Sequence, residues 1–347
     1  MMLPTRFKHI FHAIFFTFFC FVSSVQAAVI LQYHHVSDTL PKVTSISAED
    51  FEAHLQYLVT NEFKIISLPA LINALQSKQL LPPKTIAITF DDGYTNNYTS
   101  AAPLLEKYQL PYTIFVNPKL IDQGASYVMT WAQLKELSTK GATIANHSAS
   151  HAYLHQRLNN EDKKQWLARI REDIVTSEQR ITQEIGHNYR YLAYPYGEFN
   201  SDLQELVQEL GFVGIGQHSG AIGLSNDLTR LPRFPASGIY SNLETLKTKL
   251  TTLAFDFTIE PSVNSVTTLN PPSIILNFKN IDFRKAVFQC FISADNQAIL
   301  TWHNTNQVTI TAVNKLKLGR TRFNCTAPSI KHSGQYYWFS QPWVIEE

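Results

Sequence analysis

The sequence predicts an α/β fold of the (β/α) barrel kind, followed by a small all-β domain. From Val29 to about Leu253, short apolar runs alternate with helical patterns. This alternation indicates a parallel sheet, and roughly seven repeats favour a barrel. Near Phe257 the composition shifts, and after a proline-containing stretch the helical periodicity disappears. The length of 347 residues also favours two domains over one.

The first 27 residues read as a secretory signal peptide and not as part of the fold. Basic residues precede the apolar run Phe11–Val22, and Val25–Ala27 fits a small-residue cleavage site. The run is shorter than the roughly 20 residues that a spanning helix needs, so we favour cleavage over a membrane anchor. Cys20 lies inside the run without the small residues of a lipoprotein signal, so we expect no lipidation.

Seven apolar runs in the first part of the chain are strand candidates, and helical patterns separate them. Ser47 fits the N-cap of one helix, with Asp50 three residues later. Glu161–Ile185 shows one apolar face, which predicts a long helix that Gly186 ends. The strand candidates are Val29–Tyr33, Ile65–Leu68, Thr85–Phe90, Tyr112–Val116, Thr143–Ala145, Tyr191–Tyr194 and Phe212–Ile215.

The last part of the chain reads as a small β-sandwich. Cys290 and Cys325 form an even pair in an exported chain, which predicts one disulfide. With Trp302 they fit, loosely, an immunoglobulin-like sandwich in which a tryptophan packs on a disulfide between the sheets. The strand candidates are Ile274–Phe278, Ala286–Ser293, Gln297–Trp302, Gln307–Val313 and Gln335–Phe339.

These observations divide the chain into four segments. We expect a signal peptide at residues 1–27, a barrel domain at 28–255, a linker at 256–273 and a β-sandwich at 274–347.

Three short motifs carry the chemistry, and each follows a predicted strand. They are Thr89–Gly93, which contains two adjacent carboxylates, His147–His151, with two histidines four apart, and Tyr194–Gly197. Because strands of a (β/α) barrel end at one face, these motifs should meet there. One Asp and two His would leave open positions on a divalent metal, as a hydrolytic centre requires.

The three motifs, in this order, resemble those of the polysaccharide deacetylase family, which is carbohydrate esterase family 4 with its NodB homology domain. The resemblance spans about Val29 to Leu253. It implies a distorted, incomplete (β/α) barrel and a metal-dependent removal of acetyl groups from sugar polymers. It also implies that Asp92, His147 and His151 hold the metal, that Asp91 is the general base, and that the Tyr196 N–H helps to bind the oxyanion.

The chain departs from the family pattern at the third motif. The family places an arginine two residues before the proline, where it pairs with the catalytic Asp, but this chain has Ala193. Arg230 and Arg233 follow the last barrel strand and are candidate replacements, of which we favour Arg233.

A second departure concerns the general acid, because the usual Leu-x-His motif is missing near the end of the barrel. The segment Leu31–Val36 instead carries a similar element at the start of the chain. This placement resembles the circularly permuted deacetylases that act on exported poly-N-acetylglucosamine. We favour His34 as the acid, with His35 pointing to the opposite side of the strand. His218 also follows a predicted strand and is the alternative.

The expected function is therefore metal-dependent removal of N-acetyl groups from an N-acetylglucosamine-containing polysaccharide, with release of acetate. A non-catalytic glycan-binding protein and an O-acetyl sugar esterase are the alternatives. Zinc is the default metal for this ligand set, although iron, cobalt or nickel would fit.

Composition limits the partners. The formal net charge is +1 and no basic tract is present, so nothing indicates a nucleic acid partner. We expect a chain that is exported to the periplasm or the cell surface, with no membrane span after signal cleavage. The C-terminal domain is a candidate contact site for a glycan or a protein, although a strand with one core face accounts for most of its aromatic run.

Overall fold

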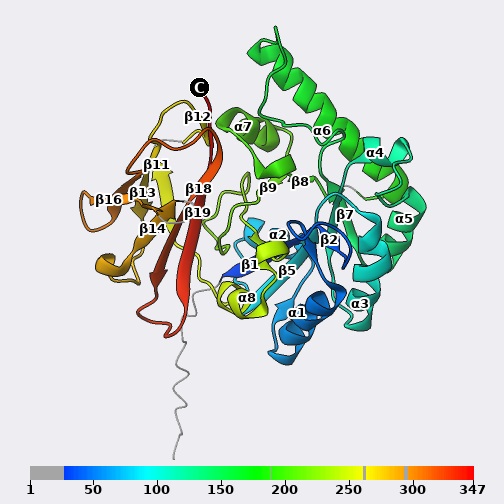
Figure 1. Ribbon diagram of the computed structural model, residues 1–347, viewed down its shortest axis with the longest axis horizontal. Coiled ribbons are helices and arrows are strands. Elements are labelled where there is room, and N and C mark those ends of the chain that lie inside the picture. The colour runs from blue at the N-terminus through cyan, green and yellow to red at the C-terminus, as the bar shows by residue number, and fades with distance from the viewer. Residues whose placement is uncertain (1–26, 188, 261–262, 293–295) are drawn as a thin grey trace, which may run out of the picture.

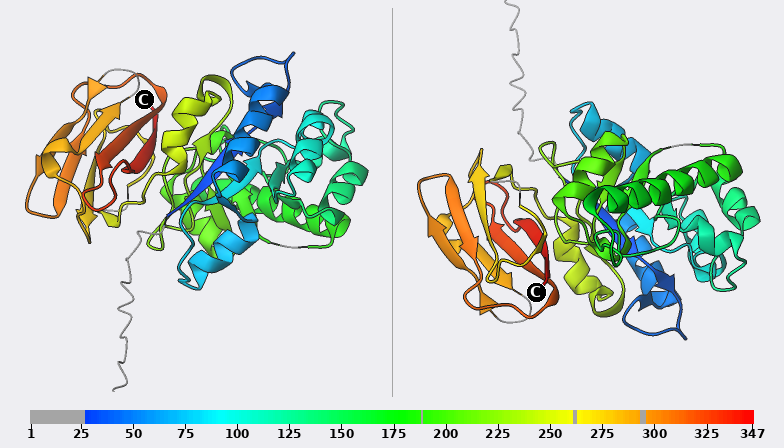
Figure 2. Two further views of the ribbon diagram at one scale, coloured as in Figure 1. Left: turned by 90° about the horizontal axis from the view of Figure 1, so that it is seen from below. Right: turned by 90° about the horizontal axis from the view of Figure 1, so that it is seen from above.

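The computed structural model describes residues 27–187, 189–260, 263–292 and 296–347, and it divides into two lobes that lie side by side (Figures 1 and 2). The barrel lobe runs to the end of α8 (Leu243–Leu250), and the sandwich lobe begins at β11 (Phe257–Glu260). The expected signal peptide lies outside the described residues, except for Ala27. None of the helices in the described ranges is long and apolar enough to cross a membrane.

A curled, parallel sheet of eight strands forms the centre of the barrel lobe, which confirms the predicted fold class. The two ends of the curled sheet come together at the segment that leads into β10, which pairs with β9 at Leu231 and with β1 at Phe234. The strands follow the order β10 (Phe234–Pro235), β1 (Ala28–Tyr33), β5 (Thr85–Phe90), β6 (Thr113–Val116), β7 (Thr143–Asn146), β8 (Tyr191–Ala193) and β9 (Val213–Ile215), with β4 (Lys64–Ile65) beside β5.

The register of this sheet brings the motifs together. Tyr33 at the end of β1 lies opposite Phe90 at the end of β5, so the residues that follow both strands share one edge. Val116 of β6 lies opposite Asn146 of β7 in the same way. Since all these strands are parallel, the segments after each of them gather at a single end of the barrel.

Helices cover the outside of the sheet (Figure 1). The predicted cap of the first one is confirmed, because the Ser47 side chain accepts from the Asp50 N–H. The long helix is also confirmed, and Gly186 ends it in a left-handed conformation with φ of 89°. The helices are α1 (Ala48–Thr60), α2 (Leu68–Gln76), α3 (Ala102–Lys107), α4 (Pro118–Asp122), α5 (Trp131–Thr139), α6 (Lys163–Ile185), α7 (Ser201–Glu209) and α8.

One predicted strand was placed too far along the chain. The segment Ile65–Leu68 was expected to be extended, but β4 ends at Ile65 and Leu68 begins α2. The reason is local, because the Ser67 side chain accepts from the Ala70 N–H and a proline occupies the first turn. Both features favour a helix start.

Two small sheets build the sandwich lobe around its own apolar core. The segment expected as a linker, residues 256–273, contributes a short strand to each sheet, β11 and β12 (Val266–Thr267). The first sheet has the order β11, β13 (Ser273–Phe278), β17 (Gln307–Thr311) and β16 (Ile299–Trp302), and the second has β12, β19 (Tyr336–Ile345), β18 (Gly319–Pro328), β14 (Gln289–Ile292) and β15 (Asn296–Gln297).

The predicted disulfide between Cys290 and Cys325 is present. Its placement differs from the immunoglobulin pattern, because the two cysteines lie directly opposite each other on neighbouring strands β14 and β18. The bridge therefore joins two strands of one sheet and not two sheets. Trp302 belongs to the other sheet, where its ring stacks on Phe278.

The two lobes are joined by specific contacts. Leu253 at the end of the barrel lobe forms a β-bridge with Tyr337 of β19. The Trp338 ring meets Phe234 edge to face at 5.3 Å, and the Arg230 guanidinium donates to Gln341 at 2.9 Å. The sandwich is thereby held against the strand ends of the barrel.

Replacing both Cys290 and Cys325 by Ala should destabilise the sandwich lobe. The bridge closes a loop with a sequence separation of 35 residues, and its loss typically costs about 2–4 kcal/mol. Chemical unfolding followed by tryptophan fluorescence would measure the change. If the wild type unfolds at the same denaturant concentration under oxidising and reducing conditions, the disulfide does not stabilise the lobe, and the prediction is wrong.

Candidate metal centre and active site

Asp92, His147 and His151 meet at the edge where the parallel strands end. One potential ligand atom from each lies within 4.8 Å of the other two. The Asp92 Oδ1 is 3.4 Å from His147 Nε2 and 3.1 Å from His151 Nε2. Asp92 follows β5 and His147 follows β7, so the parallel register brings them together.

The donor set of this cluster fits a divalent cation. The His147 Nδ1 lies 2.7 Å from the Ala193 carbonyl, so Nδ1 carries a proton and Nε2 is the nitrogen that faces the Asp92 carboxylate. The Nε2 atom is buried and has no hydrogen-bond partner. In the neutral ring, Nε2 and the carboxylate oxygen would both accept, so a cation between them would satisfy both, and a histidine oriented by a backbone carbonyl is the usual metal ligand.

The segment that carries both histidines is fixed by buried polar side chains and is not helical. The Asn117 side chain donates to the carbonyls of His147 and Ser148 at 2.5 and 3.1 Å. Asn146 accepts from the Ser148 N–H at 2.8 Å. Ser148 in turn accepts from the His151 N–H at 3.0 Å, so the backbone of the loop, and not a helix, spaces the two rings.

Asp91 is fully buried and forms a two-pronged ion pair with Arg233, which is also fully buried. The Nη1 and Nη2 atoms of Arg233 lie 2.7 and 2.8 Å from the two carboxylate oxygens. Burial alone would raise the pKa of Asp91, but the charge of Arg233, with His147 and the hydrogen bonds, lowers it to about 2. Arg230 instead contacts Gln341 of the sandwich lobe.

Two further polar side chains reach Asp91 from β1 and the segment after it. His34 places its Nε2 3.9 Å from Asp91 Oδ2, and Gln32 donates to the same oxygen at 2.7 Å. The sequence analysis did not identify Gln32. It lies two residues before His34, so alternation along the strand would have placed both on one face. His35 stacks on Tyr94 with ring centres 3.7 Å apart.

His218 is buried more deeply than His34 and lies among cations. Burial and the charges of Arg230, Arg322 and Arg233 lower its pKa well below the ordinary value. Its neighbour Gln217 reaches the site, with Nε2 3.5 Å from Asp91 Oδ2.

Tyr196 lies in a tight turn, η2 (Pro195–Gly197), with φ of 60°. Its ring stacks on Tyr153 at 3.9 Å and meets His151 edge to face at 4.7 Å. A Cβ on Gly197 would come within 2.5 Å of Gln217, so this position requires glycine. The turn is thereby held close to His151 of the candidate metal cluster.

Backbone strain collects at this site. Asp92, Ser148, His151 and Tyr196 all have positive φ, between 54° and 70°, although none is glycine. Such conformations cost of order 1–3 kcal/mol each and persist where the surrounding structure enforces them. Four of the ten non-glycine residues with positive φ among the described residues therefore lie in the loops of the candidate site.

A family model described as polysaccharide deacetylase matches residues 78–215, which include Asp92, both histidines and the Tyr196 turn. Over that segment the chain is similar to the polysaccharide deacetylase family. The chain is 26% identical to the poly-β-1,6-N-acetyl-D-glucosamine N-deacetylase of Staphylococcus epidermidis over 61% of its own length and 80% of that protein.

Solved structures show the same fold. The deacetylase domain of BpsB from Bordetella bronchiseptica is 26% identical, with a TM-score of 0.55 over 61% of this chain and 96% of that chain. The deacetylase PplD of Streptococcus pyogenes, solved with acetate, is 23% identical, with a TM-score of 0.59 over 65% and 99% of the two chains.

Replacing His147 or His151 by Ala should lower the content of divalent metal. Wild-type protein loaded with Zn²⁺ and dialysed should retain about one ion per chain, and each variant much less. Because an ion that binds only the folded state stabilises it, loading should also raise Tm wherever the site is intact, and not in the two site variants. His303→Ala, an exposed histidine of the sandwich lobe, is the matched control. Equal metal content in all four proteins would refute the site.

Arg233→Met should destabilise the protein by about 3–5 kcal/mol, because it leaves the buried Asp91 carboxylate without its cation. The double variant Asp91→Leu with Arg233→Met removes both charges and should recover most of that loss. Urea unfolding of the two variants and the wild type would give the comparison. A double variant no more stable than the single one would rule out a direct pairing.

Proposed function

We propose that this protein removes N-acetyl groups from an N-acetylglucosamine-containing polysaccharide and releases acetate. The observation that carries the proposal is the buried Asp91, held by Arg233 directly beside the Asp92, His147 and His151 cluster. The names of the related deacetylases support the same substrate class. Export to the periplasm or the cell surface is part of this proposal.

A divalent ion held by Asp92, His147 and His151 would supply Lewis acidity, polarising the acetamide carbonyl and making water acidic. Zinc suits one carboxylate and two imidazoles, and iron, cobalt or nickel fit the same ligands.

The residues of the chain account for the proton transfers. Asp91 takes a proton as water attacks the acetamide carbon, and its pairing with Arg233 keeps the carboxylate ionised beforehand. The Tyr196 N–H donates to the oxyanion of the tetrahedral intermediate, a contact of a kind typically worth about 10²–10³ in rate. His34 gives a proton to the nitrogen as the C–N bond breaks, leaving acetate and a glucosamine unit.

His34 suits the acid role better than His218. Its imidazole lies 3.9 Å from Asp91 and its side chain is 21% exposed, so a substrate can reach it. Burial lowers the pKa of His34, but the charges of Asp91 and Asp92 oppose this effect. At His218, three arginines lower the pKa further, so the protonated form that an acid needs is disfavoured.

Ala193 at the usual arginine position favours a non-catalytic glycan-binding protein only if nothing replaces the missing cation. Arg233 lies within hydrogen-bond distance of both Asp91 oxygens, so the cation is supplied from another strand. We therefore retain the enzyme as the proposal. The same site chemistry would serve an O-acetyl ester, which a paired substrate comparison would separate.

Acetate release from N-acetylglucosamine oligomers tests the proposal. The metal-loaded chain should release acetate, the metal-stripped chain should not, and Asp91→Asn should lower kcat by at least about 10²-fold. His34→Ala should slow release by a similar factor, whereas His218→Ala should have a much smaller effect. No release by the wild type with any divalent metal, from β-1,4 or β-1,6 oligomers, would count against an enzyme.

A further inference from the structure

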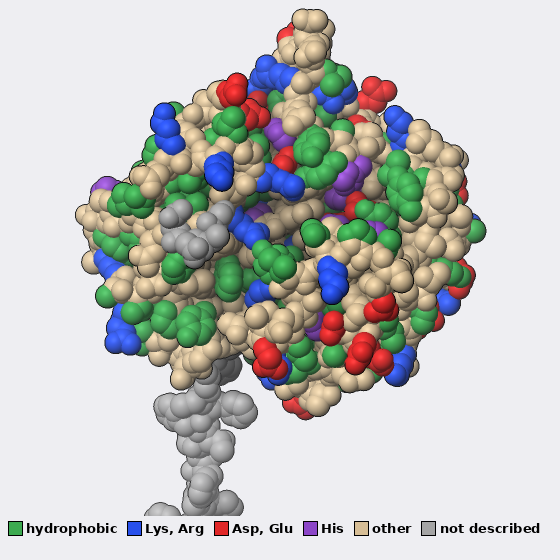
Figure 3. Space-filling view, viewed as in Figure 1, with side chains coloured by type: hydrophobic (Ala, Val, Ile, Leu, Met, Phe, Trp, Pro, Cys, Tyr) green, Lys and Arg blue, Asp and Glu red, His purple; other side chains and the backbone are tan. Residues whose placement is uncertain are grey.

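A cavity of about 310 Å³ lies between the two lobes, beside the candidate active site. Tyr196, Glu198 and Gln217 line it from the barrel lobe, and Arg320, Arg322 and Trp343 line it from the sandwich lobe. The space-filling view shows basic and histidine side chains around a hollow on this face (Figure 3). We call this space the inter-lobe cavity.

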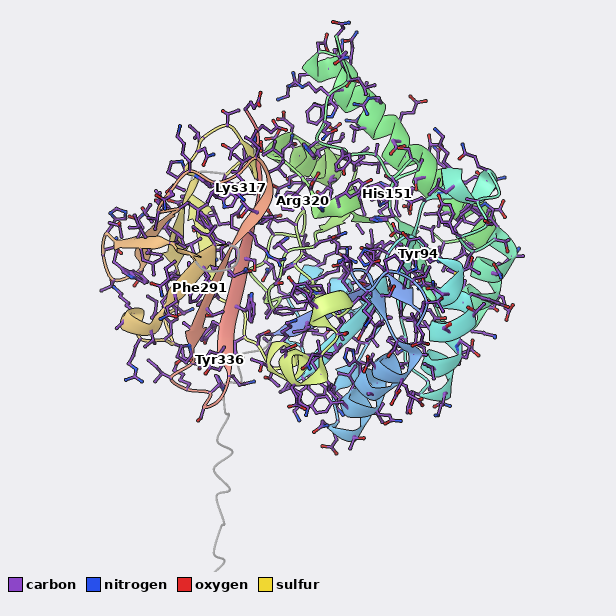
Figure 4. The ribbon with its side chains drawn as sticks, viewed as in Figure 1. Tyr94, His151, Phe291, Lys317, Arg320 and Tyr336 are labelled. Atoms are coloured by element: carbon purple, nitrogen blue, oxygen red, sulfur yellow. A yellow bond between two sulfur atoms is a disulfide. The ribbon has the colours of Figure 1, made fainter. Side chains whose placement is uncertain are left out.

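The inter-lobe cavity is continuous with the reacting centre. Tyr196 lines the cavity, and its ring meets that of the metal-site residue His151. Gln217 also lines it and reaches to 3.5 Å from Asp91. Figure 4 labels Arg320 on the sandwich lobe and His151 on the barrel lobe. A polymer with one sugar at Asp91 would therefore place a neighbouring unit in this cavity.

Two arginines of β18 contribute its charge. Arg320 has a 59% exposed side chain, lies 3.4 Å from Glu198 Oε1 and donates to the Tyr196 carbonyl at 3.5 Å. Arg322 donates to the Tyr240 hydroxyl at 2.7 Å. Only the first of these guanidiniums has a carboxylate within ion-pair distance among the described residues.

Buried cations behind the lining add to this positive field. Lys249 is buried, and its ammonium lies 4.7 Å from the Tyr240 ring centre. Burial and the charge of Arg322 lower the pKa of Lys249 to about 8. Arg230 is close enough for its charge to lower the pKa of His218, which lines the cavity. Glu198, which lines the cavity and pairs with Arg320, and Glu346 are acidic groups on this side, and both also lie near His155.

We propose that the inter-lobe cavity is a subsite for the sugar unit next to the reacting one, and that its basic side chains select an N-acetylated unit over a cationic glucosamine. The inference rests on the proposed deacetylase function. A free amine in the cavity would lie near two guanidiniums, whereas an acetamide is neutral and offers an acceptor. Deacetylated units should then be spaced along the product and not contiguous.

Binding of defined oligomers tests the subsite without turnover. Metal-loaded Asp91→Asn would be titrated calorimetrically with a fully acetylated N-acetylglucosamine tetramer and with tetramers that carry one free amine at each position in turn. We expect at least one amine isomer to bind about fivefold to tenfold more weakly, as one close like-charge contact at partial screening predicts.

Variants at Arg322 then test whether the charge of this side chain causes the preference for the fully acetylated tetramer. In the Asp91→Asn background, Arg322→Gln should reduce the preference to about twofold or less, while Arg322→Lys, which keeps the charge, should retain most of it. Arg284→Gln, an exposed arginine of the same lobe, should leave the preference unchanged. Thermal melting would verify that each variant is folded.

Equal binding of all tetramers by the parent protein would overturn the subsite, and so would an undiminished preference in Arg322→Gln. A preference lost equally in Arg322→Lys would overturn the role of charge. These outcomes are measured without hydrolysis, so they are independent of the acetate-release experiment that tests the proposed function.

Discussion

The buried ion pair between Asp91 and Arg233 is the constraint on which the rest of the site depends. Both side chains are fully buried, so each must have the other, because an isolated charge in this interior would cost several kcal/mol. The pair joins the end of β5 to the segment that closes the sheet against β1 and β9. The same ion pair therefore holds the ends of the curled sheet together and orients the proposed base.

The candidate metal ligands depend on a second kind of support, which is local and strained. Asp92, His151 and Tyr196 have left-handed backbone conformations, and buried amides and a stacked tyrosine hold their loops. Such conformations do not form from propensity alone, and they need the packed surroundings that the parallel strands supply. The sandwich lobe adds to these surroundings, since Arg320 reaches the carbonyl of Tyr196.

Local patterns predicted the elements wherever one signal was strong. Thr85–Phe90 is an unbroken apolar run, and its bounds are those expected. Two elements show where such signals end. Ile65–Leu68 is mostly apolar, but Ser67 caps a helix that begins at Leu68. Gly319–Pro328 was missed because Arg, Thr and Asn occupy its outer face, and only Phe323, Cys325 and Ala327 are buried on the other.

The sequence by itself determined the chemistry that each motif offers, because strand ends, adjacent carboxylates and paired histidines are short-range features. It also indicated the fold class, because apolar strands that alternate with amphipathic helices leave few arrangements that bury the apolar side chains of both. Only the tertiary structure decided which cation meets Asp91, because Arg233 is 142 residues away along the chain. The same holds for Gln32, for the strand partners of Cys290 and Cys325, and for the cavity between the lobes, because separations of this length are set by packing and not by local pattern.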